Sequence, residues 1–284
     1  MPFWVLYRLS DAMYLFMYYI LGYRKEVVRN NLKNAFPNKS AIEIKIITKK
    51  YYRYLCDLFL ETFKTLTISE RTMYSHCFFD PMSKKLFQKL AEEHKSIILV
   101  TGHLGNFEWA NNTFNLVLKH QMYTIYHPIR NKYFDGLMLR MRTHFGGKMV
   151  PMKDTYKEML KHKGELTVTT FIADQSPQPE NAYWMTFLNQ DTAVFKGTEI
   201  ISRKMNYPVV YGEIRRLKRG CYEMHAEILC ENPAETTDGE ITAMHIKRLE
   251  KDIILRPETW LWSHRRWKHK RPVEQTVIKE YAGR

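Results

Sequence analysis

The sequence predicts an α/β protein in which a mixed, largely parallel sheet is flanked by helices. Short apolar runs typical of buried strands recur along the chain, and the clearest covers residues 96–101. Stretches with helical periodicity separate these runs, as in proteins that alternate strands and helices. Polar residues directly follow two of the runs, where open α/β sheets hold their ligands. Since 45% of the 284 residues are apolar, the chain can bury a substantial core.

The N-terminus predicts a membrane-anchor helix. Residues 3–21 are rich in Trp, Tyr, Met, Leu and Phe, but Arg8 and Asp11 interrupt the run. The uncharged part, residues 12–23, is shorter than the roughly 18–20 residues that cross a bilayer cleanly. We therefore expect this helix to lie in the membrane interface or to dip into the bilayer.

The residues after this helix predict its orientation. Arg24, Lys25 and Arg29 follow directly, and cations beside a membrane segment favour the cytoplasmic side. The predicted organisation is an anchor over residues 1–23 and one folded domain over residues 24–284. Further along, Ser40 and Glu43 form a capping box that predicts the start of a long amphipathic helix.

The central stretch carries the first candidate site. A buried strand over residues 96–101 runs into a glycine-flanked turn with His103 and Asn106, and a helix begins near residue 107. Glu108 follows His103 by five positions, so across a strand–turn–helix corner it can fold back towards the imidazole. We interpret His103 as a general base whose tautomer and charge Glu108 sets. An apolar cleft large enough for a fatty chain is expected beside the pair.

A second strand and the helix after it carry candidate arginines. Residues 122–126 predict a strand, and the following helix extends to Phe145, where two glycines stop it. This helix carries Arg140 and Arg142. An arginine here can hold a phosphate group through two parallel hydrogen bonds.

A third strand ends at a second candidate site. Residues 166–173 are rich in β-branched residues, and Asp174 and Gln175 follow them. They project from the same edge of the predicted sheet as His103. From the residues alone, Asp174 is a turn residue ahead of Ser176 and Pro177. The family resemblance described below implies that it anchors either a substrate or Arg142.

The last third predicts a loop and more secondary structure. Residues 178–196 are expected to form an aromatic-rich loop, and residues 207–212 and 222–230 are expected to form strands. A helix follows near residue 240. Interleaved Trp, Arg and Lys in residues 257–268 suit a bilayer interface with anionic headgroups.

Several of these motifs carry a family resemblance. The run from Gly102 to Glu108 resembles the His-x4-Asp/Glu motif of glycerolipid acyltransferases, in the form used by the late (lauroyl/myristoyl) acyltransferases of lipid A biosynthesis. Residues 142–146, Arg-Thr-His-Phe-Gly, are similar to the end of that family's second motif. Asp174-Gln175 and residues 257–268 resemble its later blocks. His127 departs from the family pattern, which commonly has an arginine there.

The resemblance implies a glycerolipid acyltransferase-like fold and an O-acyltransferase activity without cofactor or metal. It implies a fatty acyl chain moved from acyl carrier protein, or from coenzyme A, to a hydroxyl of a lipid A precursor or related lipid. It also implies that residues 178–196 cover the site, and that the enzyme works on the cytoplasmic face of the inner membrane. The expected catalytic residues are His103 and Glu108. The expected substrate-binding residues are Asn106, Arg140, Arg142, Asp174 and Gln175.

The net charge of the chain indicates which classes of partner to expect. The formal net charge of +14 and the pI near 9.5 favour an acidic partner, such as an anionic membrane surface, acyl carrier protein or nucleic acid. No RNA-binding signature supports nucleic acid. The four cysteines form no CxxC pair, which favours neither a zinc site nor a disulfide scaffold and fits a reducing compartment.

Three other interpretations remain open from the residues. A phospholipid-pathway acyltransferase shares the histidine motif, although Glu108 in place of Asp argues against it. An aminolipid acceptor is a further alternative. A non-enzymatic protein that binds membranes or nucleic acid explains the charge and the aromatic residues, but it leaves His103 and Asp174 at two strand ends unexplained.

Overall fold

The computed structural model describes residues 1–272. Its strands are β1 (Cys77–Phe79), β2 (Ile97–Thr101), β3 (Gln121–Tyr126), β4 (Lys148–Pro151), β5 (Thr167–Ile172), β6 (Ala182–Phe187), β7 (Gln190–Phe195), β8 (Val209–Lys218) and β9 (Cys221–Cys230). Its α-helices are α1 (Phe3–Leu15), α2 (Lys25–Ala35), α3 (Ala41–Lys64), α4 (Glu70–His76), α5 (Pro81–Glu92), α6 (Phe107–Val117), α7 (Lys132–Arg142), α8 (Thr155–Lys161), α9 (Gly197–Met205) and α10 (Glu240–Leu255). A π-helical segment, η1 (Phe16–Leu21), follows α1, and short 3-10 turns, η2 (Met152–Asp154), η3 (Pro179–Asn181), η4 (Pro233–Glu235) and η5 (Pro257–Thr259), join other elements.

The predicted mixed, largely parallel sheet is confirmed. Seven strands lie in the order β1-β9-β8-β2-β5-β3-β4, and every neighbouring pair is parallel except β8 and β9. The central strand β2 is buried along its whole length, between β5 and β8. A strand covered on both faces reads as a continuous apolar run rather than an alternating one, which is why residues 97–101 were recognisable from the sequence.

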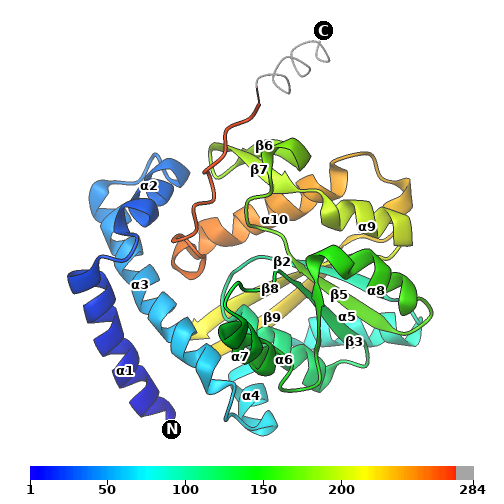
Figure 1. Cartoon of the computed structure of the whole chain (residues 1–284), viewed down its shortest axis with the longest axis horizontal. Helices are drawn as coiled ribbons and strands as arrows, with labels where there is room; N and C mark the ends of the chain where they lie inside the picture. The colour runs from blue at the N-terminus through cyan, green and yellow to red at the C-terminus, as the bar shows by residue number, and fades with distance from the viewer. Residues whose placement is uncertain (273–284) are drawn as a thin grey trace.

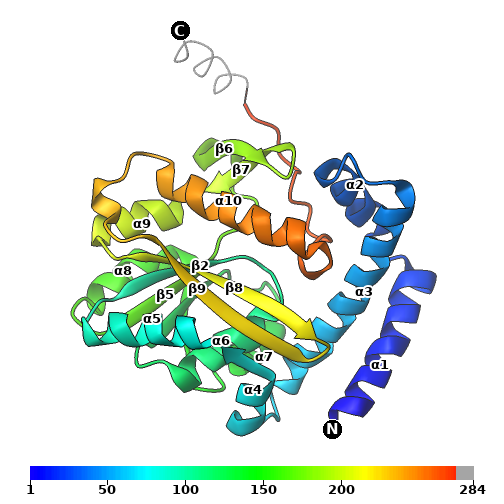
Figure 2. The same cartoon turned by 180° about the vertical axis from the view of Figure 1, so that it is seen from behind.

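Helices cover both faces of this sheet (Figures 1 and 2). Successive side chains of β2 point to opposite faces. Ile98 and Val100 pack in a core with residues of α2, α3, α10 and the β6–β7 hairpin, whereas Ile97 and Leu99 pack with residues of α4, α5 and α6. The site at the end of β2 is therefore supported from two sides.

The parallel register of β2 and β5 places the candidate residues. Thr101 lies opposite Ile172, so the residues two positions beyond each, His103 and Asp174, leave the sheet side by side. Gly102 makes this approach possible. A Cβ atom at Gly102 would lie 3.2 Å from the Asp174 carboxylate and only 2.5 Å from Leu249, so a larger residue would push α10 away from the turn.

The N-terminal helix α1 lies along α3 at one edge of the molecule (Figures 1 and 2). Its inner face is held by polar contacts as well as apolar ones, because Tyr7 donates a hydrogen bond to Glu61 and Ser10 donates one to Asp57. Its outer face is apolar and exposed, with Trp4 72% exposed. Within residues 1–272 we find no helix with the length and hydropathy needed to cross a bilayer. The two-part division at residue 23 stays a prediction, and residues 273–284 of its second part lie outside the described residues.

The predicted loop over residues 178–196 is wrong in its central part. Most of it forms an antiparallel hairpin, β6 and β7, that turns at Leu188 and Asn189. Both turn residues have positive φ, which suits the tight turns that match strand twist. The two buried residues of β6, Trp184 and Phe187, are three positions apart, so burial along this strand does not follow a two-residue alternation.

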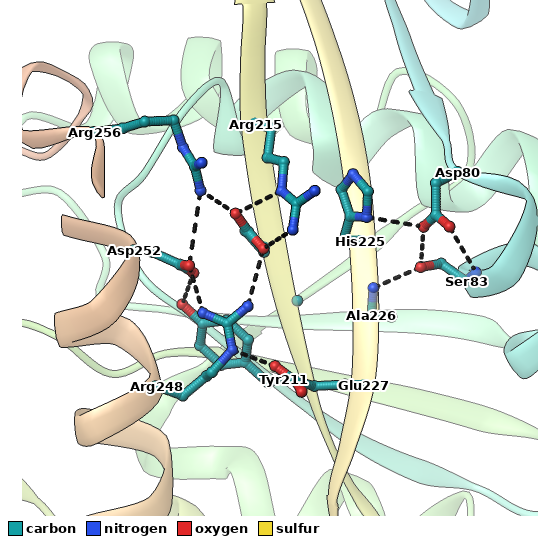
Figure 3. Close-up of polar contacts among 12 residues, drawn as sticks. Asp80, Ser83, Tyr211, Arg215, His225, Ala226, Glu227, Arg248, Asp252 and Arg256 are labelled. Atoms are coloured by element: carbon teal, nitrogen blue, oxygen red, sulfur yellow. Dashed lines mark hydrogen bonds and ion pairs between the residues drawn. The ribbon is translucent and has the colours of Figure 1, made fainter. Parts of the chain in front are cut away.

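An ion-pair network fastens α10 to the sheet (Figure 3). Buried Glu213 on β8 pairs with Arg215, Arg248 and Arg256. Arg248 also pairs with Asp252 on α10. Burial alone would raise the pKa of Glu213, but the arginine hydrogen bonds and charges outweigh it and lower the pKa to about 2. The pairing keeps α10, which packs behind Gly102, in a fixed position.

Candidate active site

His103 is held by the carboxylate of Asp174. The Nδ1 atom of His103 lies 2.5 Å from Oδ1 of Asp174, and its backbone N–H donates to Oδ2 at 2.8 Å. The indole N–H of Trp260 also donates to Oδ2, at 2.8 Å. Asp174 is almost fully buried, while the side chain of His103 is 16% exposed. The imidazole is thus anchored on its inner side and open on its outer side.

The surroundings of Asp174 keep it ionised. Burial opposes the charge, but the nearby positive charge of His103 and the hydrogen bonds from His103 and Trp260 hold the pKa of Asp174 well below its usual range. A carboxylate only accepts hydrogen bonds, so Nδ1 of His103 carries the proton and Nε2 has the lone pair in the neutral ring. The amide nitrogen of Gln175 donates to that lone pair across 3.3 Å.

Glu108 does not hold His103 in this structure, so the interpretation of a His103–Glu108 pair is wrong in its geometry. Both oxygens of Glu108 accept hydrogen bonds from Arg142, at 2.7 to 3.2 Å, in a bidentate pair. Glu108 lies in the first turn of α6, and the helix direction carries its side chain towards α7. The expectation that Asp174 anchors Arg142 is wrong for the same reason.

The other two candidates lie apart from the imidazole. Asn106 is fully buried: its oxygen accepts the Trp109 N–H as the N-cap of α6, and its amide donates to Glu61. It shapes the start of α6, and its expected role in substrate binding stays a prediction. Arg140 is exposed on α7, and among residues 1–272 no ion pair joins it to a carboxylate.

A small apolar cavity lies beside the site. The ring of Phe107 packs edge-on against the His103 imidazole at 4.9 Å between centroids. Phe107 also lines a partly open cavity of about 30 Å³ between α6 and the sheet, with Phe114, Met122 and Ile214. A space of this size holds one or two waters, not a fatty chain. The cleft that we expected is therefore not confirmed, and a chain would need these side chains to move.

The whole described fold agrees with one known family. The family model for the bacterial lipid A biosynthesis acyltransferases matches residues 1–269. The chain belongs to this family. It is therefore an acyltransferase.

Individual relatives of this acyltransferase are distant but cover most of the chain. The lipid A biosynthesis lauroyltransferase of Escherichia coli (strain K12) is 23% identical over 270 residues, which are 94% of this chain and 87% of the relative. The lipid A biosynthesis palmitoleoyltransferase of the same strain is 24% identical over 260 residues, 90% of this chain and 82% of the relative. A lipid A biosynthesis acyltransferase of Haemophilus influenzae is 28% identical over 199 residues, 63% of this chain and 60% of the relative.

Sequence reasoning missed two residues that support the acyltransferase site. Trp260 reaches Asp174 from near the C-terminus, and no local pattern links positions so far apart. Glu61 on α3 is fully buried and accepts hydrogen bonds from Tyr7, Asn106 and Tyr222. A glutamate on the apolar face of a predicted amphipathic helix is the signal that could have identified it. Within residues 1–272 no group of three or more His, Cys, Asp or Glu side chains is suited to a metal ion.

Proposed function

We propose that the protein is a membrane-associated O-acyltransferase that moves a fatty acyl chain from acyl carrier protein, or from a coenzyme A thioester, to a hydroxyl of a lipid A precursor. The family membership supports the acceptor class, since the relatives above are named for lipid A biosynthesis. The charge of +14 suits an acidic carrier protein and a phosphorylated lipid. The proposed location is the cytoplasmic face of the inner membrane.

The observation that carries the mechanism is the oriented imidazole of His103. With Nδ1–H held by Asp174, the lone pair on Nε2 faces outward, where Gln175 now contacts it. An acceptor hydroxyl would replace Gln175 at this atom and give its proton to Nε2 as its oxygen attacks the thioester carbonyl. The C–S bond then breaks, and the imidazolium returns the proton to the departing thiolate. No acyl-enzyme is needed.

The remaining candidates take supporting roles in this proposal. Glu108 and Arg142 form one unit that joins α6 to α7, and the outer edge of the Arg142 guanidinium is the proposed contact for a substrate phosphate. Arg140 stays a second candidate for that contact. Phe107 forms the proposed entrance for the fatty chain, which opens the small cavity towards buried Met122 when it binds.

The direct test uses His103→Gln in the full-length protein. Acyl transfer from acyl carrier protein to a lipid A precursor is measured by mass spectrometry of the lipid product. We expect a loss of kcat of at least about 10³-fold, since general base catalysis and its return step are both removed. Near-normal kcat in a folded His103→Gln variant would disprove the mechanism. His144→Gln, a change in the exposed turn that follows α7, serves as the control.

A further inference from the structure

A second pocket lies between α2 and α3, at the edge of the molecule where α1 also lies (Figure 1). Its volume is about 520 Å³. The residues that line it are Tyr18, Lys25, Glu26, Arg29, Lys33, Ala41, Ile42, Ile44, Lys45 and Thr48. The pocket is large enough for a polar headgroup, and none of the residues proposed for acyl transfer lines it.

The charges of this pocket are unbalanced. Lys25, Arg29, Lys33 and Lys45 supply four cations, and Glu26 is the only acidic residue of the lining. Across residues 1–272, no salt bridge joins any of the four cations to a carboxylate. Lys25 instead places its ammonium 4.0 Å from the centre of the Tyr18 ring. The pocket therefore offers positive charge that the protein itself does not neutralise.

A neighbouring pocket of equal volume shows that this imbalance is specific. It also borders α3, and its volume is about 520 Å³. Three carboxylates line it beside its four cations, and Arg216 and Arg219 form ion pairs with Asp57 and Asp11. Proximity to α3 alone thus does not produce a pocket in which no cation is paired.

The folding of α2 does not explain its row of cations. The buried side of the helix, with Val28 and Leu32, lies beside this row and does not include it. Lys25, Arg29 and Lys33 follow one another at four-residue intervals, where like charges repel and weaken a helix. Lys25 is also at the first position of α2, where the helix dipole disfavours a cation. Such an arrangement suggests a ligand that brings negative charge.

The rim of the pocket suggests which ligand this is. Ile42 lines the pocket and is 72% exposed, and η1, which supplies Tyr18, exposes Ile20 and Leu21 by 73% and 58%. Exposed apolar side chains beside unpaired cations match a phospholipid, with its anionic headgroup above its acyl chains. We propose that this pocket binds the headgroup phosphate of a membrane phospholipid and so seats α1 and η1 at the bilayer surface. The proposal does not depend on the acyl-transfer mechanism.

The test measures binding of the full-length protein to vesicles. One set contains phosphatidylcholine alone, and the other contains an equal mixture of phosphatidylcholine and phosphatidylglycerol. The pocket variant is Arg29→Gln with Lys33→Gln. The control is Lys50→Gln with Lys85→Gln, which removes the same charge from exposed positions on α3 and α5. We expect the pocket variant to bind the anionic vesicles about tenfold more weakly or worse, and the control to change much less.

A stability measurement separates a binding role from a structural one. Removing the repulsion between Arg29 and Lys33 should leave the thermal midpoint unchanged or raise it. Weaker vesicle binding in a protein that is at least as stable supports the proposal. Equal losses in the two variants would show a general charge effect and overturn it. Unchanged binding of the pocket variant to anionic vesicles would overturn it as well, and so would a variant that loses only its binding to acyl carrier protein. Both outcomes count against the proposal whatever the acyl-transfer assay shows.

Discussion

Replacing Asp174 with Asn tests the site most sharply, because the structure predicts which way the new amide will turn. Oδ2 of Asp174 accepts two hydrogen bonds, from the backbone N–H of His103 and from Trp260, whereas Oδ1 faces only Nδ1 of His103. The amide oxygen of Asn should therefore take the Oδ2 position. Its NH₂ group would then face Nδ1, which must become an acceptor. The proton of the imidazole moves to Nε2, and the lone pair needed for the reaction is lost.

The size of the effect follows from this change of tautomer. The same substitution in the triad of a serine protease lowers kcat by about 10⁴-fold, because the histidine is held in the wrong tautomer. We expect a similar loss here, equivalent to about 5 kcal/mol of transition-state stabilisation. The fold should persist, since two of the three hydrogen bonds to residue 174 remain.

The assay compares the kcat of Asp174→Asn and the wild type for transfer from acyl carrier protein to a lipid A precursor, with thermal melting of both. A Trp260→Phe variant is the matched control, because it removes one hydrogen bond to Asp174 and leaves the tautomer of His103 alone. The kcat of this variant should fall far less than 10⁴-fold. We expect a loss of about tenfold to a hundredfold, which corresponds to about 1.5–3 kcal/mol for one hydrogen bond to a charged group. Asp174→Asn with kcat close to wild type would refute the assigned tautomer.

Three further predictions follow from buried charges. Arg142→Met leaves Glu108 without its cation and should lower the free energy of unfolding, measured in urea melts, by about 3–5 kcal/mol. Adding Glu108→Gln should recover much of that loss. Equal free energies of unfolding for the single and double variants would contradict the coupling between the two residues. Burial lowers the pKa of His245 to about 4, so this residue is neutral when folded but binds a proton below about pH 6.5 when unfolded. Stability should therefore fall by up to about 3 kcal/mol as pH drops from 6.5 towards 4, and His245→Phe should flatten that slope; a parallel slope would disagree. Glu61→Leu leaves three donors unpaired, including the Asn106 amide, and should lower the free energy of unfolding by roughly 3 kcal/mol or more in urea melts. Glu61→Gln should lower it much less, and equal losses in the two variants would contradict this account.

Short-range sequence patterns predicted several main elements of the fold. The apolar run at residues 97–101 identified the central strand, and His103 and Asp174 were both expected at one edge of the sheet, as the register of β2 and β5 confirms. The capping box at Ser40 and Glu43 is present as predicted, with each residue bonding to the backbone of the other.

The partners within the site could not be predicted from local spacing. Five positions separate His103 from Glu108, which made that pair attractive, yet the parallel register brings Asp174 to the imidazole across 71 positions. Register between distant strands depends on the packing of the whole sheet, and a single sequence does not state it. The contact of Trp260 with Asp174 could not be predicted for the same reason. The aromatic neighbours of Trp260 suggested a membrane interface, but its side chain is buried and bonds to Asp174.

The tie between Asp174 and Trp260 has a consequence for how the protein is made. Synthesis proceeds from the N-terminus, and domains acquire structure as they emerge. Trp260 leaves the ribosome 86 positions after Asp174, and Thr259 beside it accepts the hydrogen bond from Gly105 in the histidine turn. The hydrogen bonds from Trp260 to Asp174 and from Gly105 to Thr259 therefore form only after residue 260 has been added to the chain.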